Sequence, residues 1–197
     1  MSEQTANRPP KWLTFKVHLA GGQQRLAEAI LYVSDRCKDA PRFGLTKLNK
    51  TIWRADFNAF AARKVPVTGR AYQKLEHGPA PVEMRPLLRE MEQDGIIEID
   101  RVDLGDGKVE QRVFAMTPAN YRFFSASDIE FLDAAIQYYW DKSGEQASED
   151  SHDMAWKTRK VGDEMPYELA FLSDEPLSGA DLKKAIQRAE ARRAPLF

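Results

Sequence analysis

The sequence predicts a compact, mainly α-helical domain with a small antiparallel β component (α+β), the latter as a winged-helix-like β-hairpin. Apolar residues recur at helical spacing in the segments 23–39 and 45–60. Two strand-like runs, 96–99 and 109–116, flank Gly105-Asp106-Gly107 and predict a hairpin over 96–116. The length of 197 residues and the hydrophobic content of 43% suit a single core.

The first 22 residues are predicted to be an extension of this domain. Residues 1–11 are polar and are expected to be disordered, because they lack the apolar side chains that folding requires. They also lack the apolar run of a secretory signal. In residues 13–19 apolar and polar side chains alternate strictly, which predicts a half-buried strand that ends before Gly21-Gly22.

Two amphipathic helices follow the extension. The first is predicted within 23–39, with an apolar stripe made of Leu26, Ala29, Ile30, Val33 and Cys37. The second starts near Leu45 and combines a stripe with flanking aromatic residues: Leu48, Ile52, Ala55 and Ala59, widened by Trp53, Phe57 and Phe60. So wide an apolar face predicts a central helix that is covered on several sides.

The segment after these helices has no helical period. Residues 64–81 are rich in proline and glycine and are predicted to form an ordered loop with a role beyond connection. A helix is predicted next, ending near Asp94-Gly95. Because proline inside a helix lacks the backbone donor, we expect this helix to begin afresh near Pro86. The hairpin of residues 96–116 comes after it.

The rest of the chain is predicted to be helical with one irregular stretch. Ser127 and Glu130 have the spacing of a capping box and predict a helix start, with the helix ending at Gly144. The basic residues of the last segment surround an apolar stripe at Leu182, Ala185, Ile186 and Ala189. We therefore divide the chain into an extension (1–22), a helical domain (23–175) and a basic C-terminal helix (176–197).

Charge and cysteine content restrict the possible partners and locations. Twenty-nine basic and thirty acidic residues give a net charge of -1, which provides no general attraction to nucleic acid or to an acidic membrane. Cys37 is the only cysteine, so an internal disulfide is impossible, as is typical of a reducing compartment. No run approaches the roughly 18 apolar residues of a transmembrane helix. We expect a cytoplasmic protein without a membrane partner.

No combination of residues points to catalysis, a metal or a cofactor. The three histidines, His18, His77 and His152, do not have the spacing of zinc ligands. Cys37 lies on the apolar stripe of a helix, which predicts a buried and inert thiol. A non-enzymatic protein is therefore expected, and an enzyme that uses His77 or His152 as acid or base is the most remote alternative.

The helix and hairpin between residues 81 and 116 have a winged-helix outline, which makes a DNA-binding regulator the alternative function. In that helix Arg85 and Arg89 are outnumbered by acids, namely Glu83, Glu90, Glu92 and Asp94. Acidic side chains repel phosphates, so we do not expect this element to read DNA. Basic residues instead concentrate between positions 35 and 74, where they form either a solvated helix face or a surface for an acidic partner.

Two stretches of the sequence resemble a known family. The first contains Leu45-Thr46-Lys47-Leu48-Asn49-Lys50, Trp53-Arg54-Ala55-Asp56-Phe57, Pro66-Val67-Thr68-Gly69, Tyr72 and His77-Gly78-Pro79-Ala80-Pro81. The second contains Ser148-Glu149-Asp150-Ser151-His152, Trp156 and Met165-Pro166-Tyr167-Glu168. In this order they resemble the SocA-like Panacea domain of bacterial and phage antitoxins, from about residue 23 to about residue 171.

The resemblance implies a helix-rich fold and a protein toxin as partner, usually encoded by the neighbouring gene. It also implies two modes of action. Most members of the family are thought to neutralise the toxin by direct contact, whereas the founding SocA resembles a proteolytic adaptor that delivers its toxin to the ClpXP protease. The sequence does not decide between the two modes.

Some motif residues are expected to shape the fold. Gly69 and Gly78 allow backbone conformations that other residues avoid, and Pro79 stiffens the segment. A carboxylate near the apolar stripe of a helix should be paired, so we expect Asp56 to bind His152 or an arginine. The expected internal polar network consists of Asp56, Ser151, His152 and Trp156.

Other residues are expected to contact the toxin. They come from the 64–81 segment, the basic helix face and the 13–19 strand, and they are Arg54, Arg70, Tyr72, Lys74, His77, Phe15 and Val17. Phe15 and Val17 would act by adding their strand to a sheet of the partner.

Overall fold

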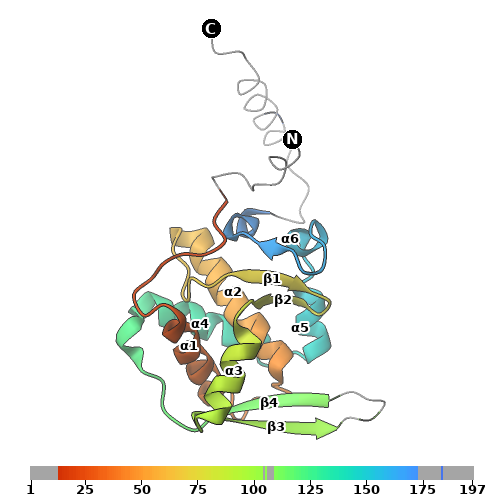
Figure 1. The fold of residues 1–197 in the computed structure, drawn as a ribbon. Coiled ribbons are helices and arrows are strands. Elements are labelled where there is room, and N and C mark those ends of the chain that lie inside the picture. The colour runs from red at the N-terminus through yellow and green to blue at the C-terminus, as the bar shows by residue number, and fades with distance from the viewer. Residues whose placement is uncertain (1–12, 104, 106–108, 173–182, 184–197) are drawn as a thin grey trace, which may run out of the picture.

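The computed structural model describes residues 13–103, 105, 109–172 and 183. Figure 1 shows α2 (Leu45–Arg63), in orange, at the centre of the molecule, as the width of its apolar face predicts. It contacts α1 (Gln23–Arg36), α4 (Ala126–Tyr139) and α5 (Gly144–Asp150). The predicted α+β class is confirmed.

The smaller helices complete the helical part. α3 (Met84–Gln93) carries a buried row of Met84, Leu87, Leu88 and Met91. Pro86 is the third residue of α3, in the first turn, where a missing N–H leaves no acceptor unpaired. The chain also forms α6 (Met154–Lys157) and two 3-10 helices, η1 (Tyr121–Phe123) and η2 (Tyr167–Phe171).

The described residues also form two small antiparallel sheets. β3 (Ile97–Asp103) pairs with β4 (Val109–Ala115), which confirms the predicted hairpin. The second sheet has the order β2-β1-β5 and consists of β1 (Tyr72–Leu75), β2 (Gly78–Pro81) and β5 (Glu164–Met165). It lies against α2 through β2, and it joins the 64–81 segment to the late segment around residue 165.

The hydrophobic interior is organised around the two faces of α2. One cluster packs α1, α3, α4 and the β3–β4 hairpin against Leu48, Ile52, Ala55 and Ala59. The other is aromatic and joins Trp53, Phe57 and Phe60 to Tyr72, Met165, Tyr167 and Leu169. The second cluster attaches the β1–β2 hairpin and η2 to the helical body.

The predicted loop over 64–81 is wrong for residues 72–81, which form the β1–β2 hairpin with Tyr72 opposite Pro81 and Leu75 opposite Gly78. Prolines argue against a strand because they cannot donate to the ladder. They are tolerated here because β2 is an edge strand.

The predicted strand over 13–19 is also wrong, because these residues form no ladder and the chain bends at Phe15. Val17 N–H donates to the carbonyl of Gly69 at 2.9 Å, and the carbonyl of Thr14 accepts from Tyr167 N–H at 2.7 Å. The two bonds go to different segments, the loop before β1 and the 3-10 helix η2, so no row of paired residues develops.

The start of α4 lies two residues before the predicted capping box. Ser125 is the N-cap, and its hydroxyl accepts from Asp128 N–H while Asp128 accepts from Ser125 N–H. Asp128 is additionally bound by Arg25, at 3.1 Å, and by Arg63. These ion pairs with distant residues fix the helix start, and the local sequence gave no sign of them. The predicted C-terminal helix of 176–197 lies outside the described residues, apart from residue 183.

Candidate functional site

Asp56, on α2, is the centre of a buried polar cluster. The residue is 0% exposed, and its carboxylate accepts from Thr68 N–H at 2.6 Å and from Tyr72 OH at 2.7 Å. The Thr68 hydroxyl also donates to it. The Tyr167 hydroxyl lies 3.3 Å from the carboxylate and donates to the carbonyl of Arg70 at 2.7 Å. We call Asp56, Thr68, Tyr72 and Tyr167 the acid cluster.

The electrostatics of the acid cluster follow from its burial. Loss of hydration raises the pKa of Asp56, and the donors from Thr68 and Tyr72 act in the opposite direction. Burial also raises the pKa of Tyr72 and of Tyr167 well above the usual range, with a further contribution from Asp56. Both hydroxyls therefore keep their protons and remain donors. The prediction that Asp56 pairs with His152 or an arginine is wrong, since its partners are neutral.

Two lysines are buried at the other end of the β1–β2 hairpin. Lys50, on α2, is 2% exposed, and its Nζ donates to the carbonyl of Pro79 at 2.9 Å. Lys74, on β1, donates to the carbonyls of Trp156 at 2.9 Å and Arg159 at 2.7 Å. Its Nζ also lies 3.5 Å from the centre of the Trp156 ring. Burial lowers the pKa of Lys50 to about 7.

Gly78 permits this close packing. Its φ of +97° is disfavoured for other residues, and a Cβ there would lie 2.6 Å from Lys50 Nζ and against the Ser151 hydroxyl. Ser151 is 0% exposed and donates to the carbonyl of Ser148 at 2.7 Å. The Ser148 hydroxyl in turn donates to the carbonyl of His77 at 2.9 Å. We call Lys50, Lys74, Gly78 and Ser151 the lysine cluster.

His152 and Trp156 lie beside the lysine cluster. Their rings stack with centroids 3.7 Å apart, and Trp156 Nε1 donates to the carbonyl of Leu75 at 3.1 Å. Burial lowers the pKa of His152, with Lys50 and Lys74 acting in the same direction, which favours the neutral ring. The single predicted network is thus two clusters: Ser151, His152 and Trp156 gather at one end of the hairpin, and Asp56 stands at the other.

Gly69 and Arg70 precede β1 and contact neighbouring segments of the chain. A Cβ on Gly69, which has φ +72°, would meet the carbonyl of Val17, so glycine lets the 13–19 segment cross here. Arg70 forms a close ion pair with Glu83, and Lys16 approaches the same carboxylate at 3.4 Å. These contacts lower the pKa of Glu83 against the opposing effect of burial.

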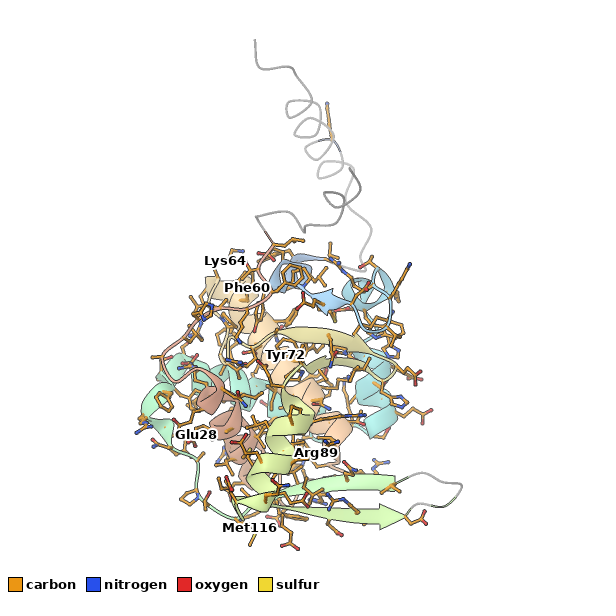
Figure 2. All side chains as sticks on the ribbon, in the orientation of Figure 1. Glu28, Phe60, Lys64, Tyr72, Arg89 and Met116 are labelled. Atoms are coloured by element: carbon orange, nitrogen blue, oxygen red, sulfur yellow. The ribbon has the colours of Figure 1, made fainter. Side chains whose placement is uncertain are left out.

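The predicted toxin-contact residues divide into interior and surface positions. Arg70, Tyr72 and Lys74 are 7%, 1% and 7% exposed, so the structure makes them interior residues, contrary to the expectation. Figure 2 shows Tyr72 in the interior, between the hairpin and α2. Of the others, His77 is exposed at the hairpin turn, and Phe15 and Val17 are partly buried.

Arg54 is partly buried and lines a groove of about 230 Å³ between α2, α5 and η2, which we call the α2–η2 groove. Its guanidinium lies 3.4 Å from the centre of the Tyr138 ring. Exposed apolar side chains, Val65, Phe171 and Leu172, stand at this side of the molecule. Figure 2 places Phe60 and Lys64 here, at the end of α2, where Lys64 Nζ lies 3.5 Å from the Phe171 ring.

Three residues of the two clusters were missed by sequence reasoning. Lys50, Thr68 and Tyr167 belong to the motif but have no predicted role, and Lys50 also falls among the basic residues between positions 35 and 74. A signal existed for Thr68 and Tyr167, because a predicted buried carboxylate needs donors and hydroxyl side chains can supply them. No comparable signal existed for Lys50, whose partner is a backbone carbonyl.

Three further observations concern metal ions, the thiol and membrane spans in the described part of the chain. It contains no group of three His, Cys, Asp or Glu residues that could hold a metal ion. Cys37 is 1% exposed, as predicted, and burial raises the pKa of its thiol to about 12, so the reactive thiolate is disfavoured. No described helix has the length and apolar character needed to cross a bilayer.

Comparison with known proteins identifies the family. The protein-family model described as "Antitoxin SocA-like, Panacea domain" matches residues 48–157, more than half of the chain. No curated protein and no solved structure matches the chain. The match begins on α2 and ends with α6, and so includes the β1–β2 hairpin, Asp56 and the whole lysine cluster. The chain belongs to the SocA-like antitoxin family that is defined by the Panacea domain.

Proposed function

We propose that this protein is an antitoxin that neutralises a cognate protein toxin by direct protein–protein binding. Family membership supports an antitoxin-like domain. The observation that carries the proposal is the burial and bonding of three ionisable residues of the motif. Asp56, Lys50 and Lys74 are each buried and bonded to neutral groups, so these three ionisable residues of the motif support the scaffold and are not accessible as an acid or a base. A rigid scaffold of this kind suits recognition of a surface.

The partner is proposed to be encoded by the neighbouring gene and to be met in the cytoplasm. The single cysteine and its buried, protonated thiol support a reducing compartment. Arg54, His77, Phe15 and Val17 remain surface or near-surface positions where a toxin could be contacted, and they stay predictions.

Co-expression tests the proposal. Each neighbouring reading frame is expressed alone and with the antitoxin, and growth is scored before co-purification. The expected result is one neighbour that is toxic alone, is tolerated with the antitoxin, and elutes with it as a stable complex. If no neighbour is toxic and none co-purifies, the proposed function is wrong.

Proteolytic delivery is the alternative mode, with ClpXP as the proposed protease. It predicts that the toxin disappears from rescued cells and reappears when the protease gene is deleted. Direct binding predicts instead that rescue persists without the protease and that toxin levels stay constant. Measuring toxin abundance by immunoblot in both strains separates the two modes.

DNA binding is the second function that the sequence raises. The order α3, β3, β4 keeps the winged-helix outline, but α3 and β3 expose Glu90, Asp94, Glu98 and Asp100. These carboxylates would face phosphates at a Coulomb cost. We therefore expect no salt-dependent binding of the free antitoxin to its promoter, which an electrophoretic mobility assay measures.

A further inference from the structure

A second groove, of about 320 Å³, lies between α1 and α3. We call it the α1–α3 groove. Its apolar lining comes from Ala27 on α1, from Leu87 and Met91 on α3, and from Ile96. Glu90 and Asp94 stand on its α3 side. Gln23 and Gln24 of α1 complete the lining, and a groove of this size with a partly apolar lining suits one or two inserted side chains.

The two carboxylates of the α1–α3 groove are uncompensated. Glu90 and Asp94 are exposed, and neither makes a side-chain hydrogen bond or an ion pair with a described residue. By contrast, the nearby Glu92 is bound by Arg101 at 2.9 Å. Two like charges one helical turn apart repel each other, so this arrangement destabilises α3 in the free protein.

The helix dipole makes the arrangement less favourable still. A helix stabilises cations near its C-terminus and anions near its N-terminus. The N-cap of α3, Glu83, suits the dipole, but the C-terminal end carries Glu90, Glu92 and the C-cap Asp94 and has no basic residue in its last turn. A cation placed in the groove would relieve both the repulsion and the dipole mismatch. The carboxylates of the groove, Glu90 and Asp94, therefore lack a cationic partner among the described residues of the free chain.

In the α2–η2 groove, by contrast, charged side chains already have partners within the protein. Its Asp150 forms a close ion pair with Lys142, and its Arg54 is stacked on Tyr138. Charges that already have partners gain less from a new one, because the existing contact must be given up. Charge complementarity therefore distinguishes the α1–α3 groove from the α2–η2 groove.

We propose that the α1–α3 groove holds a segment of the toxin that presents an aliphatic side chain flanked by Lys or Arg. The aliphatic side chain would contact Leu87, Met91 and Ile96, and the cations would meet Glu90 and Asp94. This inference rests on the proposed function and specifies its surface and the chemistry of its partner.

The test uses the full-length antitoxin and the toxin found by co-expression, purified as an inactive variant. The charge-reversal variant Glu90→Lys/Asp94→Lys is expected to weaken toxin binding at least about tenfold at low salt, and less at high salt, where screening is strong. Because lysines suit a helix C-terminus, the same variant should unfold at a higher temperature than the wild type. Weaker binding by a more stable protein excludes misfolding as the cause.

Two further variants sharpen the test. Glu98→Lys/Asp100→Lys makes the same change of net charge on exposed positions of β3 outside the groove, and should leave the Kd within about twofold, since only the groove charges meet a partner. Ala27→Met fills the apolar lining without changing charge and should weaken binding by steric exclusion.

The outcomes that overturn the inference are distinct from failure of the proposed function. If Glu90→Lys/Asp94→Lys binds the toxin with unchanged Kd while Asn58→Arg in the α2–η2 groove abolishes binding, the toxin uses the other groove. If light scattering shows self-association that the charge reversal removes, with toxin binding unchanged, the groove belongs to a second copy of this chain. If no toxin is found at all, the proposed function itself fails.

Discussion

The two ends of the β1–β2 hairpin bury opposite charges and stabilise them in the same way. At one end the carboxylate of Asp56 accepts from an amide and from hydroxyls. At the other end Lys50 and Lys74 donate to backbone carbonyls. Neither end uses a buried ion pair, although Lys50 and Asp56 are only six residues apart on α2. Each charge is held by neutral dipoles, which come from Thr68, from the β1–β2 hairpin and from the 148–167 segment.

The difference between the ends lies in how many groups share the charge. Asp56 has several donors, which partly offset the effect of burial on its pKa. Burial is the sole cause of the lowered pKa of Lys50, which has one carbonyl partner. The acid cluster should therefore contribute more to stability, and the lysine cluster should respond more strongly to pH near neutrality.

The largest expected effect is the loss of Asp56. Asp56→Ala leaves Thr68 N–H and Tyr72 OH buried without an acceptor and opens a cavity, so it should lower the free energy of unfolding by about 3–5 kcal/mol. Asp56→Asn keeps the volume and one acceptor and should lose less. Urea unfolding measures both. A loss below about 1 kcal/mol for the alanine variant would show that the acid cluster is not the stronger end.

The next effect concerns the close approach at the lysine cluster. Gly78→Ala forces a Cβ against Lys50 and Ser151 at a φ of +97°, which should cost about 2–4 kcal/mol through strain and displaced packing. Gly95→Ala is the matched control, because Gly95 also has a positive φ, +67°, but nothing lies within 4 Å of its added Cβ. It should cost only about 1 kcal/mol. Equal losses in thermal unfolding would contradict the role of the packing.

The free energy of unfolding is expected to change with pH in opposite directions for Lys50 and for Asp56. The folded pKa of Lys50, about 7, lies below the unfolded value of 10.5, so its contribution to stability is complete above 10.5 and is lost as pH falls through 7. Asp56 has a raised folded pKa, so its proton-linked contribution is present below 3.8 and is lost as pH rises through the folded value.

Lys50→Met should therefore remove a slope of up to about 1.4 kcal/mol per pH unit between pH 7 and 10. Chemical denaturation at a series of pH values measures this slope for the wild type and the variant. If both proteins give the same slope over that range, Lys50 titrates normally in the folded state, and the contrast between the clusters disappears.

The smallest effect is expected at the turn itself. His77 takes part in the lysine end only through its backbone carbonyl, which accepts from the Ser148 hydroxyl. His77→Ala should change the free energy of unfolding by no more than about 0.5 kcal/mol, as is usual for an exposed side chain. A larger loss in urea unfolding would mean that the side chain supports the hairpin.

The sequence predicted the elements whose periodicity is strong. α1, α2 and the β3–β4 hairpin were predicted because their apolar spacing and their turn residues agree. The β1–β2 hairpin was missed because Pro79 and Pro81 argue against a strand, and only the edge position of β2 makes them acceptable. The 13–19 segment alternates like a strand in sequence, yet its hydrogen bonds go to two unrelated segments.

The site was predicted less completely than the fold. The motif residues were found, and Asp56 was expected to be bonded. The burial of Arg70, Tyr72 and Lys74 was not foreseen, because basic and hydroxyl side chains usually lie at the surface. Lys74 is buried because carbonyls of residues 156 and 159 surround it, more than 80 positions away in the chain. Every residue has a backbone carbonyl, so the residue types do not predict which carbonyl will accept from a buried lysine.

The central claim is that the motif residues maintain the scaffold while the toxin is recognised at the surface. It is tested most directly by measuring the toxin Kd and the free energy of unfolding for Tyr72→Phe beside Glu90→Lys/Asp94→Lys. Tyr72→Phe removes a buried donor from Asp56 and should lower stability by about 1–3 kcal/mol while leaving the Kd of the folded protein unchanged. The surface variant should weaken binding without losing stability. If Tyr72→Phe weakens toxin binding in fully folded protein, the motif contributes to recognition and the separation of roles is contradicted.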